Sequence, residues 1–108
     1  MLDEKTYRRH LDDTLTRIDR AFDAVDPDLA ESNLAQGALT ITMRGKHRLI
    51  LSPQPSPQQL WVAFRDRAWH FDWNGEGQKW LDDRGQDIEV LTLVAELTRE
   101  AAGVALKF

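Results

Sequence analysis

The sequence predicts an α+β fold, a two-layer sandwich in which two helices pack on one face of an antiparallel β-sheet. Three observations support this prediction: an amphipathic helical pattern near the N-terminus, a series of short segments of alternating polarity separated by turns, and a second amphipathic pattern near the C-terminus. Short connections make neighbouring strands antiparallel. Because each helix has one apolar stripe, both should cover the same face of the sheet and leave the other face open to solvent.

The length and composition are typical of one globular domain spanning residues 1–108, with 42% hydrophobic and 30% charged residues. No apolar run reaches the roughly 18 residues that a membrane span needs, and the N-terminus lacks the apolar core of an export signal, so we expect a cytoplasmic protein. The absence of cysteine excludes disulfides, thiol catalysis and cysteine-ligated zinc or iron–sulfur clusters. The net charge is −4, and the four cations of residues 32–65 are too few and scattered for a nucleic-acid-binding surface.

The first helix is predicted from apolar residues at spacings of 4, 4, 3, 4 and 3, which place one stripe along a helix. These residues are Tyr7, Leu11, Leu15, Ile18, Phe22 and Val25. The helix should end near Val25, because Asp26 precedes Pro27 and is disfavoured in the helical conformation.

The middle of the chain predicts four or five short strands. Leu39, Ile41 and Met43 alternate with polar residues, which indicates a first strand beginning at Gly37, and residues 47–51 should form the second. Residues 52–59 contain three prolines, which predict an extended connector rather than a central strand. Residues 60–66 and 68–73 should form another strand pair, followed by a strand over residues 78–83.

The last element should be a helix over residues 87–103. One side of it carries Ile88, Leu91, Val94, Ala95 and Thr98. Gly103 is placed to end the helix, and residues 104–108 should form a short tail packed along the domain.

An acidic stripe follows the first helix. At about 100° per residue, Asp12, Asp19, Asp23 and Asp26 fall within about 60° of one another. The stripe continues into Asp28 and Glu31, which we expect on the loop before the first strand. Negative charge at a helix C-terminus costs about a few tenths to 1 kcal/mol per residue.

Two interpretations of this stripe remain open: a solvated helix face, or a surface for a cation or a basic partner. Arg17 and Arg20 point away from the stripe and do not neutralise it, which favours the second. Carboxylates are hard ligands that suit iron, magnesium, calcium or manganese. Because the ligands would be exposed, any metal should bind weakly and keep several waters.

Trp61 is predicted on the open face of the sheet. Leu60, Val62 and Phe64 should face the helices, which leaves Trp61 and Arg65 on the other side. The ring is either covered by neighbouring side chains or exposed as an anchor for a partner, since Trp and Arg are enriched at interfaces. Other aromatic residues, namely Trp69, Phe71 and Trp73, are assigned to the core, and the pattern does not place Trp80.

No motif indicates an enzyme. The chain has no G-x-S-x-G nucleophile motif and no Gly-rich phosphate loop. His10 and His47 should be surface residues. His70 and Asp72 lie two apart on one strand face, where a metal pair is conceivable and a solvated cross-strand contact is the better interpretation.

The chain resembles the frataxin family, in particular its short bacterial members of the CyaY type. The resemblance covers essentially the whole length. It depends on the acidic first helix and on the segments GALTITM, QQLWVAF with Trp61, WHFDW and KWLDDRG in this order.

This resemblance implies an iron-binding accessory protein of iron–sulfur cluster assembly. Weak binding of ferrous and ferric iron would use Asp19, Asp23, Asp26, Asp28 and Glu31, with Asp12 as an extension. The implied partners are the cysteine desulfurase, through Asp19 and Asp23, and the iron–sulfur scaffold protein, through Trp61 with Arg65 beside it. The resemblance implies a monomer that can form oligomers with iron, and no nucleic-acid or membrane partner.

Two functions remain open from the sequence. The acidic surface either holds iron, or docks on a basic patch of the desulfurase with iron only competing for it. A ferroxidase activity is disfavoured, because the stripe lacks the Glu-x-x-His pattern of a preorganised di-metal site.

Overall fold

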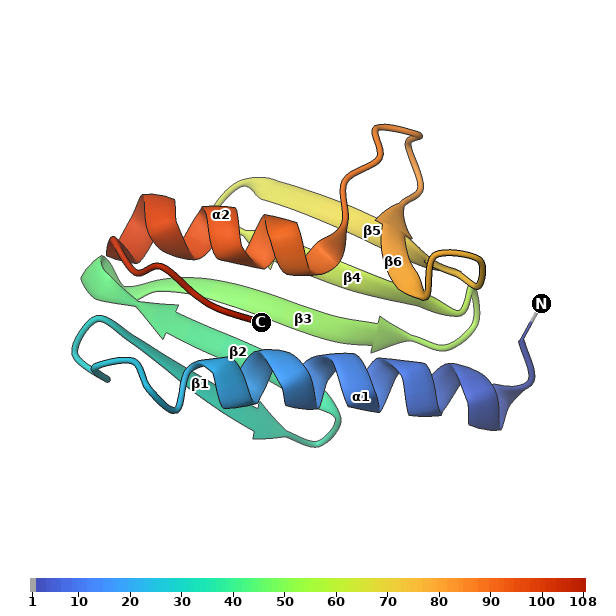
Figure 1. Cartoon of the computed structure of the whole chain (residues 1–108), viewed down its shortest axis with the longest axis horizontal. Coiled ribbons are helices and arrows are strands. Elements are labelled where there is room, and N and C mark those ends of the chain that lie inside the picture. Colours follow the sequence, from blue (N-terminus) through green and yellow to red (C-terminus); the bar gives the residue numbers. More distant parts are fainter. Residues whose placement is uncertain (1) are drawn as a thin grey trace.

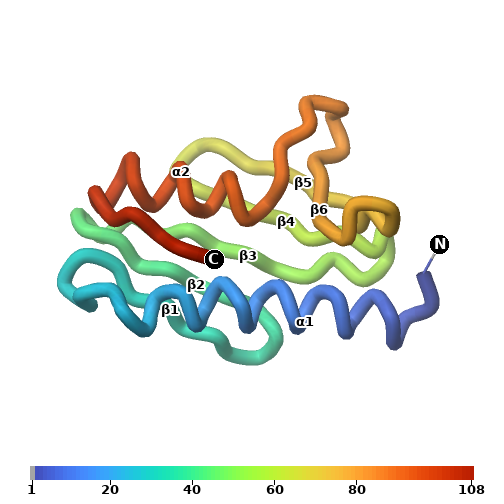
Figure 2. Tube along the Cα trace, in the orientation of Figure 1, coloured from blue at the N-terminus to red at the C-terminus, as the bar shows by residue number. Residues whose placement is uncertain are grey.

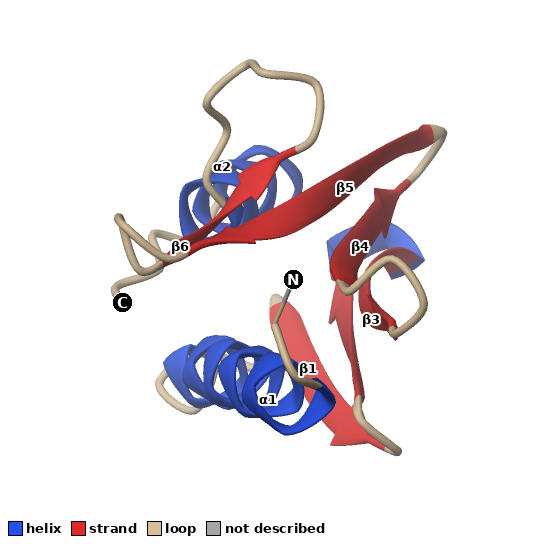
Figure 3. Ribbon diagram, turned by 90° about the vertical axis from the view of Figure 1, so that its right-hand side faces the viewer, coloured by secondary structure: helices blue, strands red, loops and turns tan. Residues whose placement is uncertain are grey.

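The computed structural model describes residues 2–108, and over these residues the fold is the predicted α+β sandwich (Figure 1). The elements follow the chain as α1 (Glu4–Ala21), β1 (Ala30–Ala35), β2 (Ala38–Met43), a 3₁₀ turn (Arg44–Lys46), β3 (His47–Gln54), β4 (Gln59–Phe64), β5 (Arg67–Asn74), β6 (Lys79–Asp82) and α2 (Val90–Ala102). The strands form one antiparallel sheet in the order β1-β2-β3-β4-β5-β6. Both helices lie on the same side of the curved sheet (Figure 3). No helix of residues 2–108 is long and apolar enough to cross a bilayer.

Helix α1 carries the predicted apolar stripe but ends earlier than predicted. Asp3 caps its N-terminus by accepting a hydrogen bond from the Thr6 backbone N–H at 2.7 Å. The buried face comprises Tyr7, Leu11, Leu15 and Ile18. The helix stops at Ala21 rather than near Val25. Phe22 is the C-cap residue, and its side chain is buried in the core. The pattern misled because Phe22 and Val25 do pack against the core, but from turns of i→i+3 type and not from a helix.

The sheet has six strands over the described residues, so the expected number was too low. The missed strand is β1, which was predicted to be loop and pairs with β2 along its whole length, from Ala30↔Met43 to Ala35↔Ala38. The proline-rich connector prediction was also partly wrong. Strand β3 continues through Pro53 to Gln54, where it pairs with β4 only, because its pairing with β2 ends at Leu39↔Leu51.

Helix α2 begins at Val90, three residues later than predicted, and ends where the sequence predicts. Glu89 caps the N-terminus by accepting from the N–H groups of Leu91 and Thr92. Gly103 adopts a left-handed conformation with φ of 69° and donates its N–H to Arg99, which is the expected glycine C-cap.

The buried side of α2 differs from the predicted side. Val94 and Thr98 are buried as expected, whereas Ile88, Leu91 and Ala95 are only half-buried. Four further residues complete the buried face, namely Val90, Leu93, Leu97 and Ala102. The tail after Gly103 turns back between the two helices (Figure 2), and its Val104 and Leu106 pack against the core as predicted.

The two faces of the sheet have different roles. Most side chains of β2 to β5 that point toward the helices are fully buried, and these include Leu39, Ile41, Leu49, Leu51, Leu60, Val62, Phe64 and Phe71. Alternation then places Trp61 and His70 on the opposite, open face. Helix packing therefore decides which side chains the sheet can present to a partner.

Tyr7 joins α1 to the sheet by hydrogen bonds as well as by packing. Its hydroxyl donates to the backbone carbonyl of Gln59 at 2.7 Å and accepts from the backbone N–H of Gln54 at 3.2 Å. These two residues are paired at the end of the β3–β4 hairpin. Burial raises the pKa of the Tyr7 hydroxyl, so the neutral form that makes both bonds is retained.

We predict that Tyr7→Phe lowers the free energy of unfolding by about 1–3 kcal/mol, because two backbone groups lose their partner while the ring stays in place. Chemical denaturation of both proteins measures this difference. A variant as stable as the parent protein would show that water replaces the hydroxyl at no cost.

Candidate functional site

The acidic ridge comprises Asp12, Asp19, Asp23, Asp26, Asp28 and Glu31, and it crosses three kinds of structure. Asp12 and Asp19 lie on α1, seven residues or about 10 Å apart along the helix axis. Asp23, Asp26 and Asp28 lie in the turns after the helix, and Glu31 lies on edge strand β1 rather than on the expected loop. Asp19 is half-buried and the other five carboxylates are exposed.

Two ridge carboxylates also support the local fold. Asp19 accepts a hydrogen bond from the Ser32 hydroxyl at 2.5 Å, which ties the last turn of α1 to β1. Asp26 accepts from the backbone N–H of Asp28 at 2.9 Å, the contact that stabilises an Asx turn. Within residues 2–108, no side-chain hydrogen bond or ion pair engages the carboxylates of Asp23 and Asp28. The ridge thus combines anchored and free carboxylates.

The ridge does not form a closed metal cage. Among the described residues, no group of three or more histidine or acidic side chains is arranged to hold a metal ion. A cation on this surface would therefore contact one or two carboxylates at a time and retain water in its other positions. Such a surface selects poorly among hard cations.

Trp61 lies on the open face as predicted, and it is half-buried by its neighbours. Its ring stacks on the His70 ring from the directly opposite position of β5, with centroids 4.1 Å apart and planes 12° apart. Its Nε1–H donates to the Gln59 side-chain oxygen at 2.8 Å. The Gln59 amide nitrogen donates in turn to Asp72 at 3.1 Å and to Asp83 at 3.2 Å. Gln59 and Asp83 had not been singled out from the sequence.

Arg65, which was predicted beside Trp61 on the open face, is placed differently. Arg65 is not on the strand, because β4 ends at Phe64 and Arg65 forms the following turn with φ of 58°. Its guanidinium lies over the Phe64 ring, 4.9 Å from the centroid. His70 makes the cross-strand contact that was the preferred interpretation, by stacking on Trp61, and its Nδ1 lies 3.6 Å from a carboxylate oxygen of Asp83.

The other aromatic residues belong to the helix side of the sheet. Trp80, which the sequence left unplaced, is fully buried and donates its Nε1–H to the Thr14 hydroxyl at 3.0 Å. Trp73 packs against Trp80 and stacks on His10 of α1, with centroids 3.9 Å apart, so His10 is less exposed than expected. These contacts hold α1 against β5 and β6.

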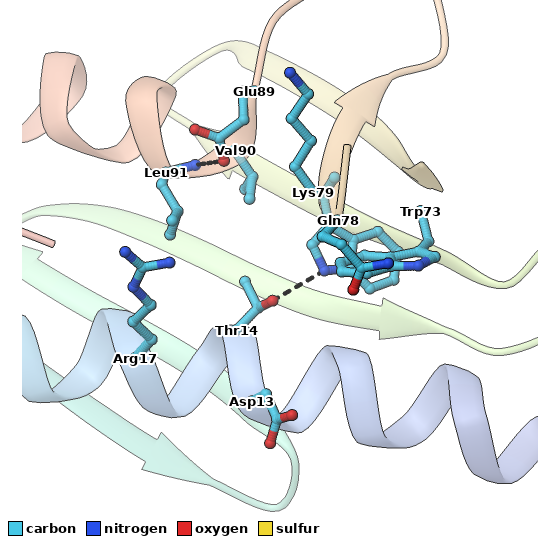
Figure 4. Close-up of a pocket in the computed structure, with 10 residues that line it drawn as sticks. Asp13, Thr14, Arg17, Trp73, Gln78, Lys79, Glu89, Val90 and Leu91 are labelled. Carbon is cyan, nitrogen blue, oxygen red and sulfur yellow. Dashed lines mark hydrogen bonds between the residues drawn. The ribbon is translucent and has the colours of Figure 1, made fainter. Parts of the chain in front are cut away.

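A cavity of about 140 Å³ lies between α1, β6 and the start of α2 (Figure 4). Two of the polar groups that line it have partners inside the protein: Trp80 bonds to Thr14, and the Glu89 carboxylate caps α2. In Figure 4, Arg17 extends from α1 toward Leu91, whereas Lys79 extends from β6 away from α1. Neither the acidic ridge nor Trp61 opens into it, so we assign it no role in the site.

The loop between β6 and α2 is fixed by Asp82. Its carboxylate accepts from the backbone N–H groups of Arg84, Gln86 and Ile88 at 2.8–3.2 Å. Burial alone would raise the pKa of Asp82, but these donors outweigh it and hold the pKa below its ordinary value. The carboxylate is therefore ionised at neutral pH, and its contribution to stability is lost only as pH falls through the lowered pKa. The same loop places Asp83 beside His70.

Comparison with known families and proteins places these features in context. Residues 1–104 match the family model described as a frataxin-like domain. The chain is 36% identical to a relative from Stutzerimonas stutzeri and 33% identical to one from Azotobacter vinelandii, both named iron–sulfur cluster assembly protein CyaY. Each comparison covers 99% of this chain and 96% of the relative.

Solved structures agree on the fold. Frataxin from Psychromonas ingrahamii superposes with a TM-score of 0.88 at 20% identity and covers 98% of this chain and 97% of its own. Trimeric frataxin from Saccharomyces cerevisiae, described as complexed with ferrous iron, gives a TM-score of 0.64 at 21% identity, with 96% and 88% covered.

The difference between anchored and free ridge carboxylates can be tested directly. We predict that Asp19→Ala lowers the free energy of unfolding by about 1–2 kcal/mol through loss of the Ser32 contact. The matched variant Asp23→Ala should change it by less than about 0.5 kcal/mol, as is usual for exposed positions. Denaturant titrations of the two variants give both values, and equal losses would contradict the assignment.

Proposed function

This chain belongs to the frataxin-like family, and from that premise we propose that it is an accessory protein of iron–sulfur cluster assembly. In this proposal the acidic ridge binds ferrous and ferric iron weakly, as cargo and not as a resident cofactor. The protein regulates the cysteine desulfurase and the scaffold protein, and it catalyses no reaction of its own. The names of the bacterial relatives and the ferrous complex described for yeast frataxin support the proposal.

The observation that carries the proposal is the run of exposed carboxylates along one edge of the molecule. It extends from α1 through the following turns to β1 with no basic side chain paired to it among residues 2–108. Exposed carboxylates that are not neutralised attract cations and basic protein surfaces. Hydrated iron fits such a surface, because it is a hard cation that accepts oxygen ligands.

A second candidate function uses the same residues without iron. Here the ridge is a docking surface for a basic patch of the desulfurase, and iron competes for it. The lack of any convergent three-ligand group among residues 2–108 favours this candidate, because a dedicated iron site gains affinity from preorganised ligands. Trp61, on the open face, would contact the scaffold in either case, with Arg65 at the end of the same hairpin.

We predict that ferrous iron, added without oxygen, broadens amide signals first between Asp19 and Glu31 in a nuclear magnetic resonance spectrum. Millimolar magnesium should reverse the broadening, because exposed carboxylates discriminate little between hard cations. The variant Asp23→Asn with Asp28→Asn serves as the control and should broaden less at equal iron. Broadening centred on His70 and Asp83 would contradict the ridge assignment.

We predict that Asp23→Lys combined with Asp28→Lys weakens binding to the cysteine desulfurase at low salt. The loss should shrink as salt rises, because charges more than about 10 Å apart are screened at 0.1 M. Calorimetric titrations in metal-free buffer at two salt concentrations measure it. If this variant binds the desulfurase with unchanged affinity but no longer binds iron, iron binding is the only function of the ridge.

A further inference from the structure

Four side chains on the open face form a closed ring of contacts around Trp61. The indole stacks on His70, His70 faces Asp83, Asp83 accepts from Gln59, and Gln59 accepts from the indole Nε1–H. The residues come from β4, from β5 and from the residue after β6. A backbone hydrogen bond also joins two of these residues, since the N–H of Asp83 donates to the carbonyl of His70 at 2.8 Å.

This ring of contacts fixes the orientation of the indole. A tryptophan on the open face of a sheet has no core around it and can adopt several side-chain rotamers. Here one ring face is covered by the imidazole, and the only polar atom of the indole is already bonded to Gln59 at 2.8 Å. Rotation of the indole would break both contacts.

The orientation of His70 is fixed in turn by a rigid support. Asp83 follows Asp82, whose carboxylate holds three backbone N–H groups of the loop. Asp83 also accepts from Gln59, so it can move little without disturbing two strands. The imidazole thus lies between the Trp61 ring and the Asp83 carboxylate, with Nδ1 3.6 Å from the carboxylate oxygen.

We propose that His70 is a positioning residue that holds Trp61 in the orientation in which it docks on the scaffold protein. This inference rests on the proposed function of Trp61 as an anchor. It adds that Gln59, His70 and Asp83 preorganise that anchor. Binding then avoids the entropy cost of ordering a mobile aromatic side chain, which is the usual benefit of preorganisation.

A purely structural role of this ring of contacts explains the arrangement less well. The core lies on the other face of the sheet, where Val62 and Phe71 are essentially fully buried, whereas Trp61 and His70 are both half-exposed. A network that only stabilised the fold would not need to leave the larger aromatic ring accessible. Tryptophan is enriched among the residues that contribute most of the binding energy at interfaces.

The test compares His70→Ala, His70→Phe and Trp61→Ala for affinity to the scaffold protein. We predict that His70→Ala weakens binding roughly three- to tenfold, the effect expected for reordering one side chain. His70→Phe keeps the stacked ring and should recover most of this loss. In the Trp61→Ala background, removal of His70 should have no further effect on affinity.

Two measurements separate positioning from stability. The indole N–H signal of Trp61 should shift and broaden in His70→Ala and return toward the parent position in His70→Phe. His10→Ala is the matched control, because it removes the other stacked histidine–tryptophan pair, at Trp73, and should leave scaffold affinity unchanged. If His70→Ala proves unstable, His70→Gln takes its place in the same comparison.

The outcomes are distinguishable. If His70→Ala binds like the parent protein while Trp61→Ala does not, this inference is wrong and the anchor role of Trp61 stands. If Trp61→Ala itself binds like the parent protein, the anchor role and this inference are both wrong. Equal losses of affinity in His70→Ala and His10→Ala would show that global stability, not positioning, determines binding.

Discussion

The register of the β4–β5 pair is the constraint on which the presented surface depends. Leu60 pairs with Phe71 and both are buried beneath the helices, so the next pair, Trp61 with His70, must lie on the open face. A slip of one residue would exchange the two faces and place Trp61 in the core. The register is fixed by the short turn after Phe64, where Arg65 has a positive φ, and by the hydrophobic residues that the helices cover. Packing of the helices on one face of the sheet thus determines which side chains a partner can contact on the other face.

The acidic ridge follows from the way α1 ends. Phe22 is drawn into the core immediately after the last helical residue, and the chain leaves the helix through turns that carry Asp23, Asp26 and Asp28. Because these residues lie beyond the helix, their charges oppose the helix dipole less than they would if the helix extended to Val25. Asp19 and Asp26 are stabilised by hydrogen bonds to Ser32 and to the backbone. Local structure thus compensates part of the cost of collecting negative charge.

The sequence predicted the features that depend on local hydrophobic periodicity and missed those that depend on strand pairing. Both helices, the open-face position of Trp61 and the glycine stop at Gly103 follow from local patterns, and the structure confirms them. Strand β1 was missed because the edge segment AESNLA buries only Ala30 and shows little alternation. The contact of Trp61 with His70 could have been found only by fixing the hairpin register, which requires the turn residues to be known. Trp80 gave no signal, because its partner Thr14 lies 66 residues away in the chain.

The ridge and the Trp61 network are far enough apart to act independently. Glu31 is on β1 and Trp61 is on β4, so three strand spacings, or roughly 14 Å, separate them across the sheet. This distance exceeds the Debye length of about 10 Å at 0.1 M salt, so charge on the ridge has little influence on the docking of the ring. The intervening strands β2 and β3 carry no acidic side chain that would extend the negative surface toward Trp61. One partner that used both surfaces would have to span this width, whereas two partners, one basic and one with a pocket for an aromatic ring, could bind at the same time. The second arrangement agrees with the function proposed above, in which the ridge and Trp61 contact different partners.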